Sequence, residues 1–363
     1  MWNKALGINL KKLEEKLPLI WYHEFAFWLT FWKKTEELSF LKDCPSQSLQ
    51  QTLMNLAKAF KDGFDKKQKN KRIPKYKKRY IGDSFCYPQG FKIENSRVFL
   101  PKIGWVSFFK SREINGIPKN LTVRKMADGW SISIQVEIKT EEKKHPSKTS
   151  VGIDLGIACF ATLSTGEFFA PLNSFRKSEK KLAKAQKKFS NSWRRQKRKI
   201  GILHQKIRNR RLDRLHWIKS KISKNHARIV PQDLKIKNIS KTSKENPGKN
   251  VKAKSGLNKS IIDQGWGLFR DLLQYKQSLL GGKVVLVNPQ YTSQKCPKCL
   301  KIDSRNRQIQ SGVECIGCKH KDHADLIGAI KILAAGHVAV ACQANSIRSR
   351  QQEPVGIREV VLS

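Results

Sequence analysis

At 363 residues, the chain is long enough for two or three folded domains, each with its own hydrophobic core. Hydrophobic residues make up 39% of the chain, including 9 Trp and 17 Phe, which excludes disorder as the default state. Lys and Arg total 73 against 29 Asp and Glu, a formal net charge of +44. A polyanion would relieve that self-repulsion in a compact fold, so nucleic acid is the expected partner.

We expect no membrane span and no secretory signal. Residues 17–32 are rich in apolar side chains but are interrupted by His23 and Glu24, and we find no run of about 18 uncharged apolar residues. Residues 1–10 lack the basic start and small-residue cleavage site of a secretory signal. The expected location is therefore the cytoplasm, in association with the nucleoid. In that reducing compartment the eight cysteines favour metal ligation over disulfides.

Residues 2–64 follow a helical pattern. Four aromatic residues share one expected helix face, and a second apolar stripe repeats at steps of three and four: Phe27, Trp28, Phe31 and Trp32, then Leu49, Leu53, Leu56, Phe60 and Phe64. We interpret both sets as helical core rather than as a cofactor site.

The segment after these helices is strongly basic. Residues 61–80 contain ten basic and two acidic residues around Pro74, and Lys75 and Lys77 lie beside Tyr76. The segment is either a phosphate-binding surface or a solvated linker, and composition does not decide between them.

The period changes to two between residues 85 and 140. Apolar and polar residues alternate over residues 130–139, as in a half-buried strand, and four glycines mark turns: Gly90, Gly104, Gly116 and Gly129. A small β domain is predicted here. The polar segment 139–150, which contains Pro146, is the expected domain boundary.

A second unit begins at Val151. Residues 151–156 form a short apolar strand with Asp154 as its carboxylate, and residues 158–163 complete a β-hairpin before a turn. Residues 176–224 then hold 20 basic and 2 acidic residues above an apolar helical stripe. We predict a long helical hairpin with a cationic outer face, which either binds nucleic acid or is merely solvated.

The remaining elements alternate between strands and helices. Strands are predicted at residues 228–234 and 283–288, and helices at residues 257–280 and 323–335. The tail from Gly336 is weakly patterned and is expected to be mobile.

Four cysteines form the strongest local motif. Cys296 and Cys299 make one CxxC pair, 15 residues separate it from the next, and Cys315 and Cys318 make the second. This spacing predicts one tetrahedral zinc in a ribbon too small to hold a core of its own. All four ligands would be protein thiolates, so the site would be structural. Four unrelated buried cysteines are the alternative interpretation.

Two carboxylates form a second, weaker signal. Asp154 lies on a first strand and Asp325 begins a late helix, with another strand between them. This is the element order of a ribonuclease-H-like fold, in which acids from separate elements converge on Mg²⁺ for phosphodiester hydrolysis. An Asp in a GxDxG strand also occurs in nucleotide-binding folds and in turns.

Taken together, the motifs resemble the TnpB (OrfB) family of transposon-encoded, RNA-guided DNA endonucleases, relatives of the type V CRISPR effectors. The resemblance covers nearly the whole chain and depends on six segments in order: residues 46–53, 73–77, 151–156, 233–234, 292–296 and 323–325. It implies an α/β plus α+β multidomain protein with a helical lobe, a small wedge β-barrel, and a RuvC domain of ribonuclease-H-like fold containing an inserted zinc ribbon. The implied bounds are 1–66 for the helical lobe, 67–148 for the wedge, 149–291 for the first RuvC part with its basic hairpin, 292–322 for the ribbon, 323–335 for the last RuvC helix and 336–363 for the tail.

The resemblance also implies partners and site residues. The partners would be a guide RNA and target DNA, and the cofactors would be structural zinc and catalytic Mg²⁺. Asp154 and Asp325 would bind Mg²⁺ as catalytic residues, and nine basic residues would contact nucleic acid: Lys75, Lys77, Arg194, Arg195, Lys197, Arg198, Arg208, Arg210 and Arg211.

Several positions depart from the family pattern. The middle catalytic position, a Glu in the family, is Gln232 in this chain. Pro231 lies inside an expected central strand, and Ile327 replaces the Asn usual two residues after the last Asp. The chain also begins at a point that resembles the family's first helix, so the opening strand of the wedge barrel is expected to be absent.

Four functions remain open at this stage. The first is a Mg²⁺-dependent, RNA-guided DNA nuclease. The second, which Gln232 favours, is a protein of the same architecture that binds guide and target but cleaves poorly. A zinc-ribbon protein that binds structured RNA without a guide is the third, and a decayed transposon copy is the fourth.

Overall fold

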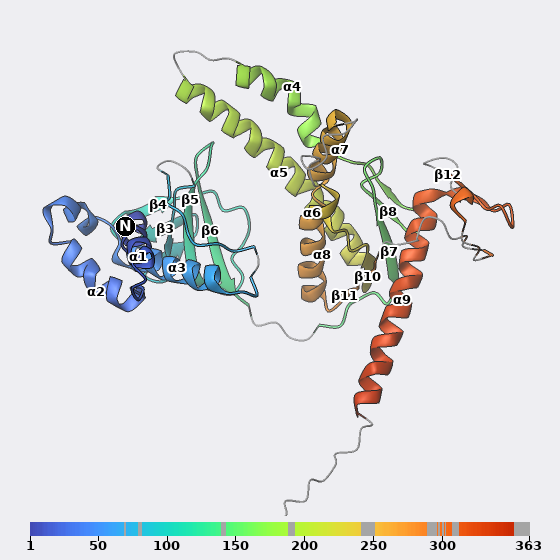
Figure 1. Cartoon of the computed structure of the whole chain (residues 1–363), viewed down its shortest axis with the longest axis horizontal. Helices are drawn as coiled ribbons and strands as arrows, with labels where there is room; N and C mark the ends of the chain where they lie inside the picture. Colours follow the sequence, from blue (N-terminus) through green and yellow to red (C-terminus); the bar gives the residue numbers. More distant parts are fainter. Residues whose placement is uncertain are drawn as a thin grey trace, which may run out of the picture. The chain divides into compact units, whose positions relative to one another are not determined.

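The computed structural model describes residues 1–68, 70–78, 82–138, 143–187, 193–240, 251–288, 296, 298–299, 301, 303–306 and 312–351. The chain divides into two compact units, Met1–Lys139 and Thr140–Ser363, coloured from blue to teal and from green to red in Figure 1. The division falls at the start of the polar segment 139–150, where the sequence predicts a boundary.

The first unit begins with helices. These are α1 (Trp2–Glu14), α2 (Tyr22–Trp32), the 3₁₀ helix η1 (Glu36–Lys42) and α3 (Ser46–Phe64). The stripe predicted on α3 is buried at Leu49, Leu53, Leu56 and Phe60, which lie in one core with residues of α1 and α2. The helical prediction for this stripe is therefore confirmed, except that Phe64 at the helix end is 46% exposed.

The prediction for α2 is correct for one of its four aromatic residues. Trp32 is buried as predicted, together with Phe25 and Leu29, but Phe27 and Phe31 are 74% and 66% exposed. Residues 25, 29 and 32 follow the helical repeat, so they do share one face. The helix is apolar on nearly every side, and its sequence alone therefore gives no preference among faces.

Two three-stranded antiparallel sheets follow. The first has the order β1-β5-β6 and the second the order β2-β3-β4. The bounds are β1 Ser84–Tyr87, β2 Lys92–Glu94, β3 Arg97–Leu100, β4 Gly104–Ser107, β5 Ile117–Lys125 and β6 Trp130–Glu137. Both sheets contribute to one small core that contains Tyr87, Val98 and Leu121. The Ser48 hydroxyl donates to the Cys86 carbonyl and so connects α3 to β1.

The second unit is built on a five-stranded sheet. Its strand order is β11-β10-β7-β8-β9, with β10 and β11 parallel to β7, β8 antiparallel to β7, and β9 antiparallel to β8. The bounds are β7 Ser150–Leu155, β8 Ala161–Leu163, β9 Phe168–Phe169, β10 Arg228–Pro231 and β11 Lys283–Val284. The chain thus places its first strand in the middle of the sheet, between the predicted hairpin and the later parallel strands.

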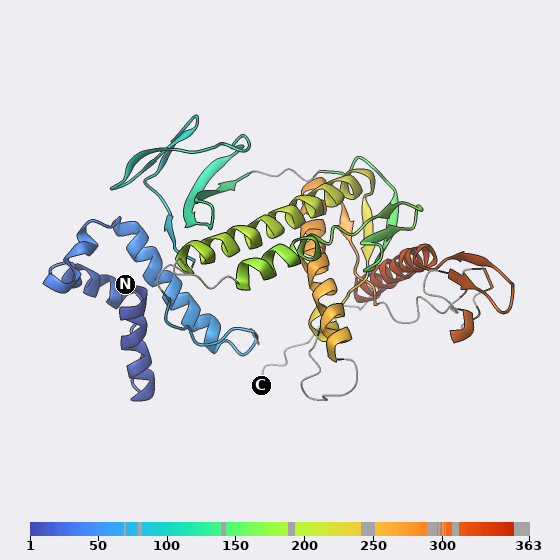
Figure 2. The ribbon, with the colours of Figure 1, turned by 90° about the horizontal axis from the view of Figure 1, so that it is seen from above.

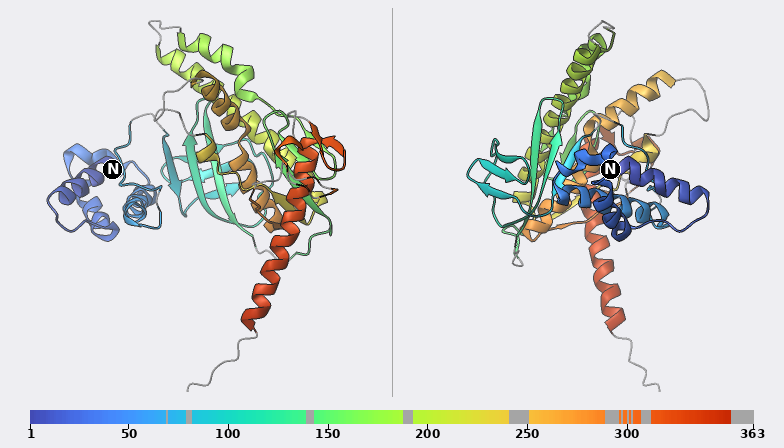
Figure 3. Two further views of the ribbon diagram at one scale, coloured as in Figure 1. Left: turned by 45° about the vertical axis from the view of Figure 1, so that its right-hand side comes forward. Right: turned by 90° about the vertical axis from the view of Figure 1, so that its left-hand side faces the viewer.

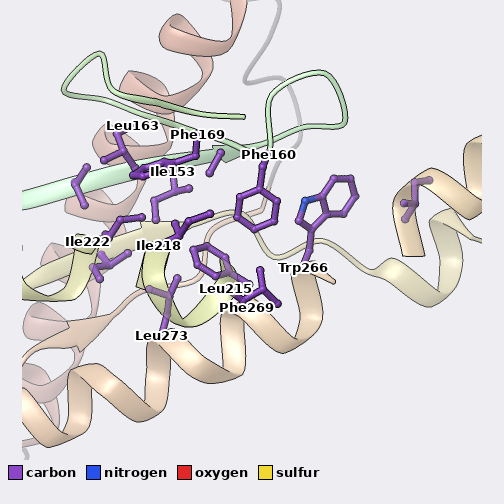
Figure 4. Close-up of a cluster of buried hydrophobic side chains, with 14 residues drawn as sticks. Ile153, Phe160, Leu163, Phe169, Leu215, Ile218, Ile222, Trp266, Phe269 and Leu273 are labelled. Carbon is purple, nitrogen blue, oxygen red and sulfur yellow. The ribbon is translucent and has the colours of Figure 1, made fainter. Parts of the chain in front are cut away.

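Helices pack on both faces of this sheet. Ile153 of β7 and Ile229 of β10 face a core formed with α5 (Trp193–Asn225) and α8 (Trp266–Leu280), in which Phe160 and Phe269 stack edge to face (Figure 4). The opposite face carries α9 (Ala324–Gln351), seen in red in Figure 3. Because strand side chains alternate, the residues between the core positions of β7 and β10 face α9.

The α9 helix lies unusually close to the sheet at Gly152. A Cβ built on Gly152 would lie 2.1 Å from the Ala329 carbonyl oxygen. We predict that Gly152→Ala lowers the free energy of unfolding by about 1–3 kcal/mol, because backbone atoms must move apart. Gly256→Ala is the matched control, since its Cβ would have no neighbour within 4 Å in the interior of α7 (Val251–Gln264). The melting temperature measured by thermal unfolding should fall for Gly152→Ala and should not fall for Gly256→Ala. Equal melting temperatures of the two variants would contradict the close approach of α9 to the sheet.

The predicted basic hairpin is present as α4 (Ser174–Lys187) and α5, which lie antiparallel and side by side in Figure 2. Its base is held by Asp263 of α7, whose carboxylate is 1% exposed. That carboxylate accepts hydrogen bonds from the Ser174 hydroxyl and the Phe175 amide, so it satisfies a free donor at the start of α4.

The terminal helix is longer than predicted. It runs from Ala324 to Gln351, where the sequence predicts a helix to residue 335 and a mobile tail from Gly336. The helical repeat fades in the later part because side chains such as Val338, 63% exposed, no longer face a core. Within the described residues, Ala324–Ala341 is by length and composition apolar enough to cross a membrane, although it contains Asp325 and Lys331 and so is not the uncharged run that we expect to be absent. A core helix passes the same test, and Ile327 and Ile332 of this stretch are fully buried in the protein.

Candidate metal sites and nucleic-acid surface

The fold brings Asp154 and Gln232 together. Asp154 lies near the carboxyl end of β7, and Gln232 directly follows the neighbouring parallel strand β10 and bridges to Val287. Because side chains alternate between the two faces of a sheet, Asp154 and Gln232 both lie at positions that face α9. The Gln232 amide nitrogen donates a hydrogen bond to Asp154 Oδ1. Gln232 is 9% exposed and Asp154 is half-buried, so the pair has only limited access to solvent.

Asp325 lies in the first turn of α9, which passes directly over Asp154. A Cβ built on Gly328 would lie 2.8 Å from Asp154 Oδ2, so a larger residue at position 328 would require this carboxylate to move. Asp325 precedes Gly328 by three residues and therefore lies on the same side of the helix, one turn nearer its start. The three sequence-predicted positions Asp154, Gln232 and Asp325 thus come from adjacent elements at one edge of the sheet.

Asp233 points to the other face of the sheet. Its carboxylate oxygen Oδ1 lies 3.2 Å from Nη1 of Arg270 on α8. This is the orientation expected of a residue adjacent to Gln232 on an extended segment. Asp233 therefore lies in an ion pair and does not take the place of the missing middle acid.

Pro231 ends the regular part of β10. It pairs with Ile153 of β7, and its carbonyl accepts the Val287 amide at 3.3 Å, but it has no amide hydrogen of its own. Ordered pairing on that side stops at Val284 and resumes only as a single bridge beside Gln232. The predicted strands 228–234 and 283–288 are accordingly shorter, and Gln232 lies just beyond a weakened point in the ladder.

The four cysteines form one cluster. All four sulfur atoms lie within 4.8 Å of one another, with Cys296 and Cys318 at 3.6 Å and Cys299 and Cys315 at 3.4 Å. A tetrahedral zinc with Zn–S bonds near 2.3 Å requires sulfur atoms about 3.8 Å apart, so the donor set fits this ion. The predicted ribbon start, residues 292–295, lies outside the described residues.

Backbone amides prepare the cluster for an anionic sulfur. The Cys318 amide donates to the Cys315 thiol and lowers the pKa of that thiol to about 6. The thiolate is the form of cysteine that binds zinc.

The ribbon is connected directly to the carboxylate site. Its two strands, β12 (Gly312–Glu314) and β13 (Lys321–His323), pair antiparallel, and β13 continues into α9. Val313 of the ribbon packs with Ala324 and Ile327 at the start of that helix. Ile327, which departs from the family pattern, is therefore fully buried as part of this joint.

Most of the predicted nucleic-acid residues are exposed. On α5 they are Arg195, Lys197, Arg198, Arg208 and Arg210. The Arg194 side chain lies outside the described residues. In the first unit, Lys75 is exposed, and Lys77 places its amine 3.8 Å from the centre of the Trp2 ring, where burial lowers its pKa. Exposure leaves these side chains able to meet a polyanion, and their binding role stays a prediction.

Arg211 has a structural role in addition to the one predicted. Its guanidinium lies 3.1 Å from the buried carboxylate of Asp263. This ion pair connects α5 to α7, and a buried carboxylate without its partner would be strongly destabilising. Arg211 therefore stabilises the base of the hairpin, and its contact with nucleic acid stays a prediction. Sequence reasoning also missed Asp263, because its partners are up to 89 residues away and no local motif marks it.

Two family profiles and several known proteins match this chain. A family profile described as probable transposase, OrfB_IS605, matches residues 133–243, and the TNB domain of Cas12f1-like proteins matches residues 266–332. InsQ of Escherichia coli (strain K12), named as an RNA-guided DNA endonuclease, is 47% identical over 98% of this chain and 90% of its own length. A protein of the same description from Streptomyces pristinaespiralis is 30% identical over 94% of this chain and 84% of its own.

A solved structure shares the fold. The cryo-EM structure of the Cas12f1–sgRNA–target DNA complex contains a chain that matches with a TM-score of 0.50, at 11% identity, over 91% of this chain and 79% of that one. At this identity the match concerns architecture only.

Proposed function

The chain belongs to the TnpB (OrfB) family of transposon-encoded, RNA-guided DNA endonucleases, and from this membership we propose that it binds a guide RNA and a matching DNA target. We further propose that the middle position of its RuvC-type site limits cleavage. The proposal rests chiefly on one observation, the hydrogen bond from the Gln232 amide to the Asp154 carboxylate.

The arrangement of the second unit supports a ribonuclease-H-like nuclease site. Two parallel strands end side by side at Asp154 and Gln232, and the helix that carries Asp325 crosses the same edge. In such a site, Mg²⁺ ions bound to the acids would activate water and stabilise the leaving oxygen. In this chain Asp154 and Asp325 are the side chains that would hold Mg²⁺.

Gln232 changes the electrostatics of that site. With a Glu, the three positions would supply three negative charges to two divalent cations, whereas this chain supplies two charges and a neutral amide. The amide nitrogen also donates a hydrogen bond to Asp154 Oδ1, and this oxygen is one that would otherwise bind a cation. To ligate a metal, Gln232 would have to rotate its carbonyl inward and lose this bond. The donor set therefore fits a single weakly held cation better than a pair.

Guide and target binding does not depend on that site. The basic residues predicted on α5 are exposed, which supports a role in binding phosphates. The zinc ribbon would hold the start of α9 in place. A protein that binds its target without efficient cleavage fits both observations.

We predict that charge removal on α5 weakens nucleic-acid binding in a salt-dependent manner. Replacing Arg195, Lys197 and Arg198 by Gln should reduce the slope of log K against log salt by up to about 2–3, since each phosphate contact contributes about 0.7–0.9. Filter binding of the guide RNA between low and high salt gives the slope. Exchanging three exposed lysines of the first unit, Lys11, Lys34 and Lys42, for Gln is the charge-matched control. If both triple variants have the wild-type slope, the hairpin is only a solvated face.

The proposed function is tested with the native guide. The full chain is purified with the RNA of its own transposon end, and binding to a matched duplex is compared with binding to a scrambled duplex. Guide-dependent retention of the matched duplex alone supports the proposal. Equal retention of both duplexes would instead indicate a basic protein without guide function.

A further inference from the structure

The last turns of α5 carry an exposed indole beside an open hollow. A cavity of about 300 Å³ is bordered by Trp217, Ser220, Lys221, Lys224 and Asn225, which follow one another at steps of three, one, three and one along a single helix face. Trp217 is 51% exposed. Its ring meets Phe169 of β9 at 6.0 Å and 79°, an edge contact. The sheet thus holds one side of the indole while the rest faces the solvent.

Cations flank this indole along the helix. The Arg214 guanidinium lies 4.6 Å from the ring centre, and the Lys221 amine lies 5.7 Å from it. Lys221 also pairs with Glu167 at the sheet edge, so part of its charge is already compensated. Arg214 and Lys224 have no carboxylate partner among the described residues, and the hollow therefore keeps a net positive charge.

We propose that Trp217 is a stacking platform for one base of a single-stranded nucleic acid, with Arg214 and Lys224 as contacts for the flanking phosphates. A half-exposed indole offers a π-face to any base, and stacking of this kind is tolerant of sequence. Arg214 and Lys221 lie about one helical turn to either side of Trp217, and Lys224 lies about two turns beyond it on the same face. A strand that follows the helix would place its base on the ring and its phosphates near these cations.

The polar residues of the hollow suit the edge of a stacked base. Ser220 and Asn225 offer a hydroxyl and an amide within the same hollow, and each can both donate and accept a hydrogen bond. A ring that only sealed the core would require neither a cavity nor unpaired cations beside it. The strand is either the guide RNA or one DNA strand, and only this identification rests on the proposed function.

The test measures binding of short single strands to the full chain freed of co-purified RNA. The probes are fluorescein-labelled 12-nucleotide RNA and DNA and a matching abasic DNA of the same charge. Trp217→Ala should weaken binding of the base-containing probes about 5-fold to 100-fold, because it removes one stacked base. Trp217→Phe should retain most of the affinity, and Lys224→Gln should reduce the salt slope by about 0.7.

Two controls make the result specific. Tyr275→Ala removes another aromatic ring of the same unit, 61% exposed on α8 and with no cation over it among the described contacts, and should leave binding unchanged. The abasic probe should bind wild type and Trp217→Ala equally. Wild-type affinity of Trp217→Ala for the base-containing probes, or an equal loss with the abasic probe, would overturn the platform.

Photocrosslinking then identifies the strand. With 4-thiouridine in the guide or 4-thiothymidine in the DNA, the peptide containing Trp217 should crosslink to one of them and lose that crosslink in Trp217→Ala. No crosslink from either strand would contradict the proposal. The short-strand assay requires no guide. Its result therefore tests the stacking role of Trp217 even if guide-dependent targeting fails.

Discussion

Purified protein is expected to contain one equivalent of zinc, and replacing Cys315 by Ser should remove it. The four sulfur atoms already lie within 4.8 Å of one another, and the Cys315 thiol is the one whose pKa is lowered to about 6. In small zinc domains the metal contributes on the order of 10 kcal/mol to folding, so its loss should unfold the ribbon. Because Val313 packs on Ala324 and Ile327, the first turn of α9 should loosen as well.

Metal analysis and limited proteolysis measure these two effects. The Cys315→Ser variant should lose its zinc and become sensitive to protease between residues 296 and 323, while the core sheet stays protected. Cys159→Ser is the matched control, because Cys159 lies outside the cluster and donates to backbone carbonyls of the β8–β9 hairpin. Less than half an equivalent of zinc in the wild type, or equal protease sensitivity of both variants, would exclude a structural metal.

Local patterns predicted the elements that carry the site. The apolar strand around Asp154, the basic hairpin and the CxxC pairs each have a signal within a short window, and the structure contains each of them. Parallel strands bring their ends to one edge, which is why Asp154 and Gln232 meet although they are 78 residues apart. The order of elements pointed to Asp154 and Asp325, whereas Gln232 was placed through the family resemblance.

Other features depend on contacts that no local pattern records. The buried face of α2 could not be chosen because the helix is apolar on most sides, and Phe27 and Phe31 were assigned to the core although they are exposed. The length of α9 was underestimated because its later turns have no core to face. In the sequence, Arg211 is one of several basic residues of α5. Its structural role becomes visible only through its ion pair with the buried Asp263 carboxylate.

The direction of the Gln232 amide is the finding with the greatest functional weight. The resemblance to the family implies only that a carboxylate is missing from the middle position. The structure adds that the amide nitrogen is turned toward Asp154, so the pair satisfies itself in the absence of a cation. Two carboxylates at these positions would repel each other and would need divalent ions to lie together.

Replacing Gln232 by Glu is therefore expected to create both metal dependence and cleavage. Without divalent ions the variant should be less stable than the wild type, since two acids then share a half-buried site, and Mg²⁺ or Mn²⁺ should raise its melting temperature by binding the folded state. The wild type should show little such rise. With the native guide, a matched duplex and Mg²⁺, Gln232→Glu should cut on the order of 100-fold faster than the unaltered chain. The double variant Gln232→Glu with Asp154→Ala is the control, because it carries the new carboxylate without its partner and should neither cut nor respond to metal. Efficient cutting by the unaltered chain that is abolished by Asp154→Ala would show instead that Gln232 leaves the site active, and the melting curves would then show a metal response in the wild type as well.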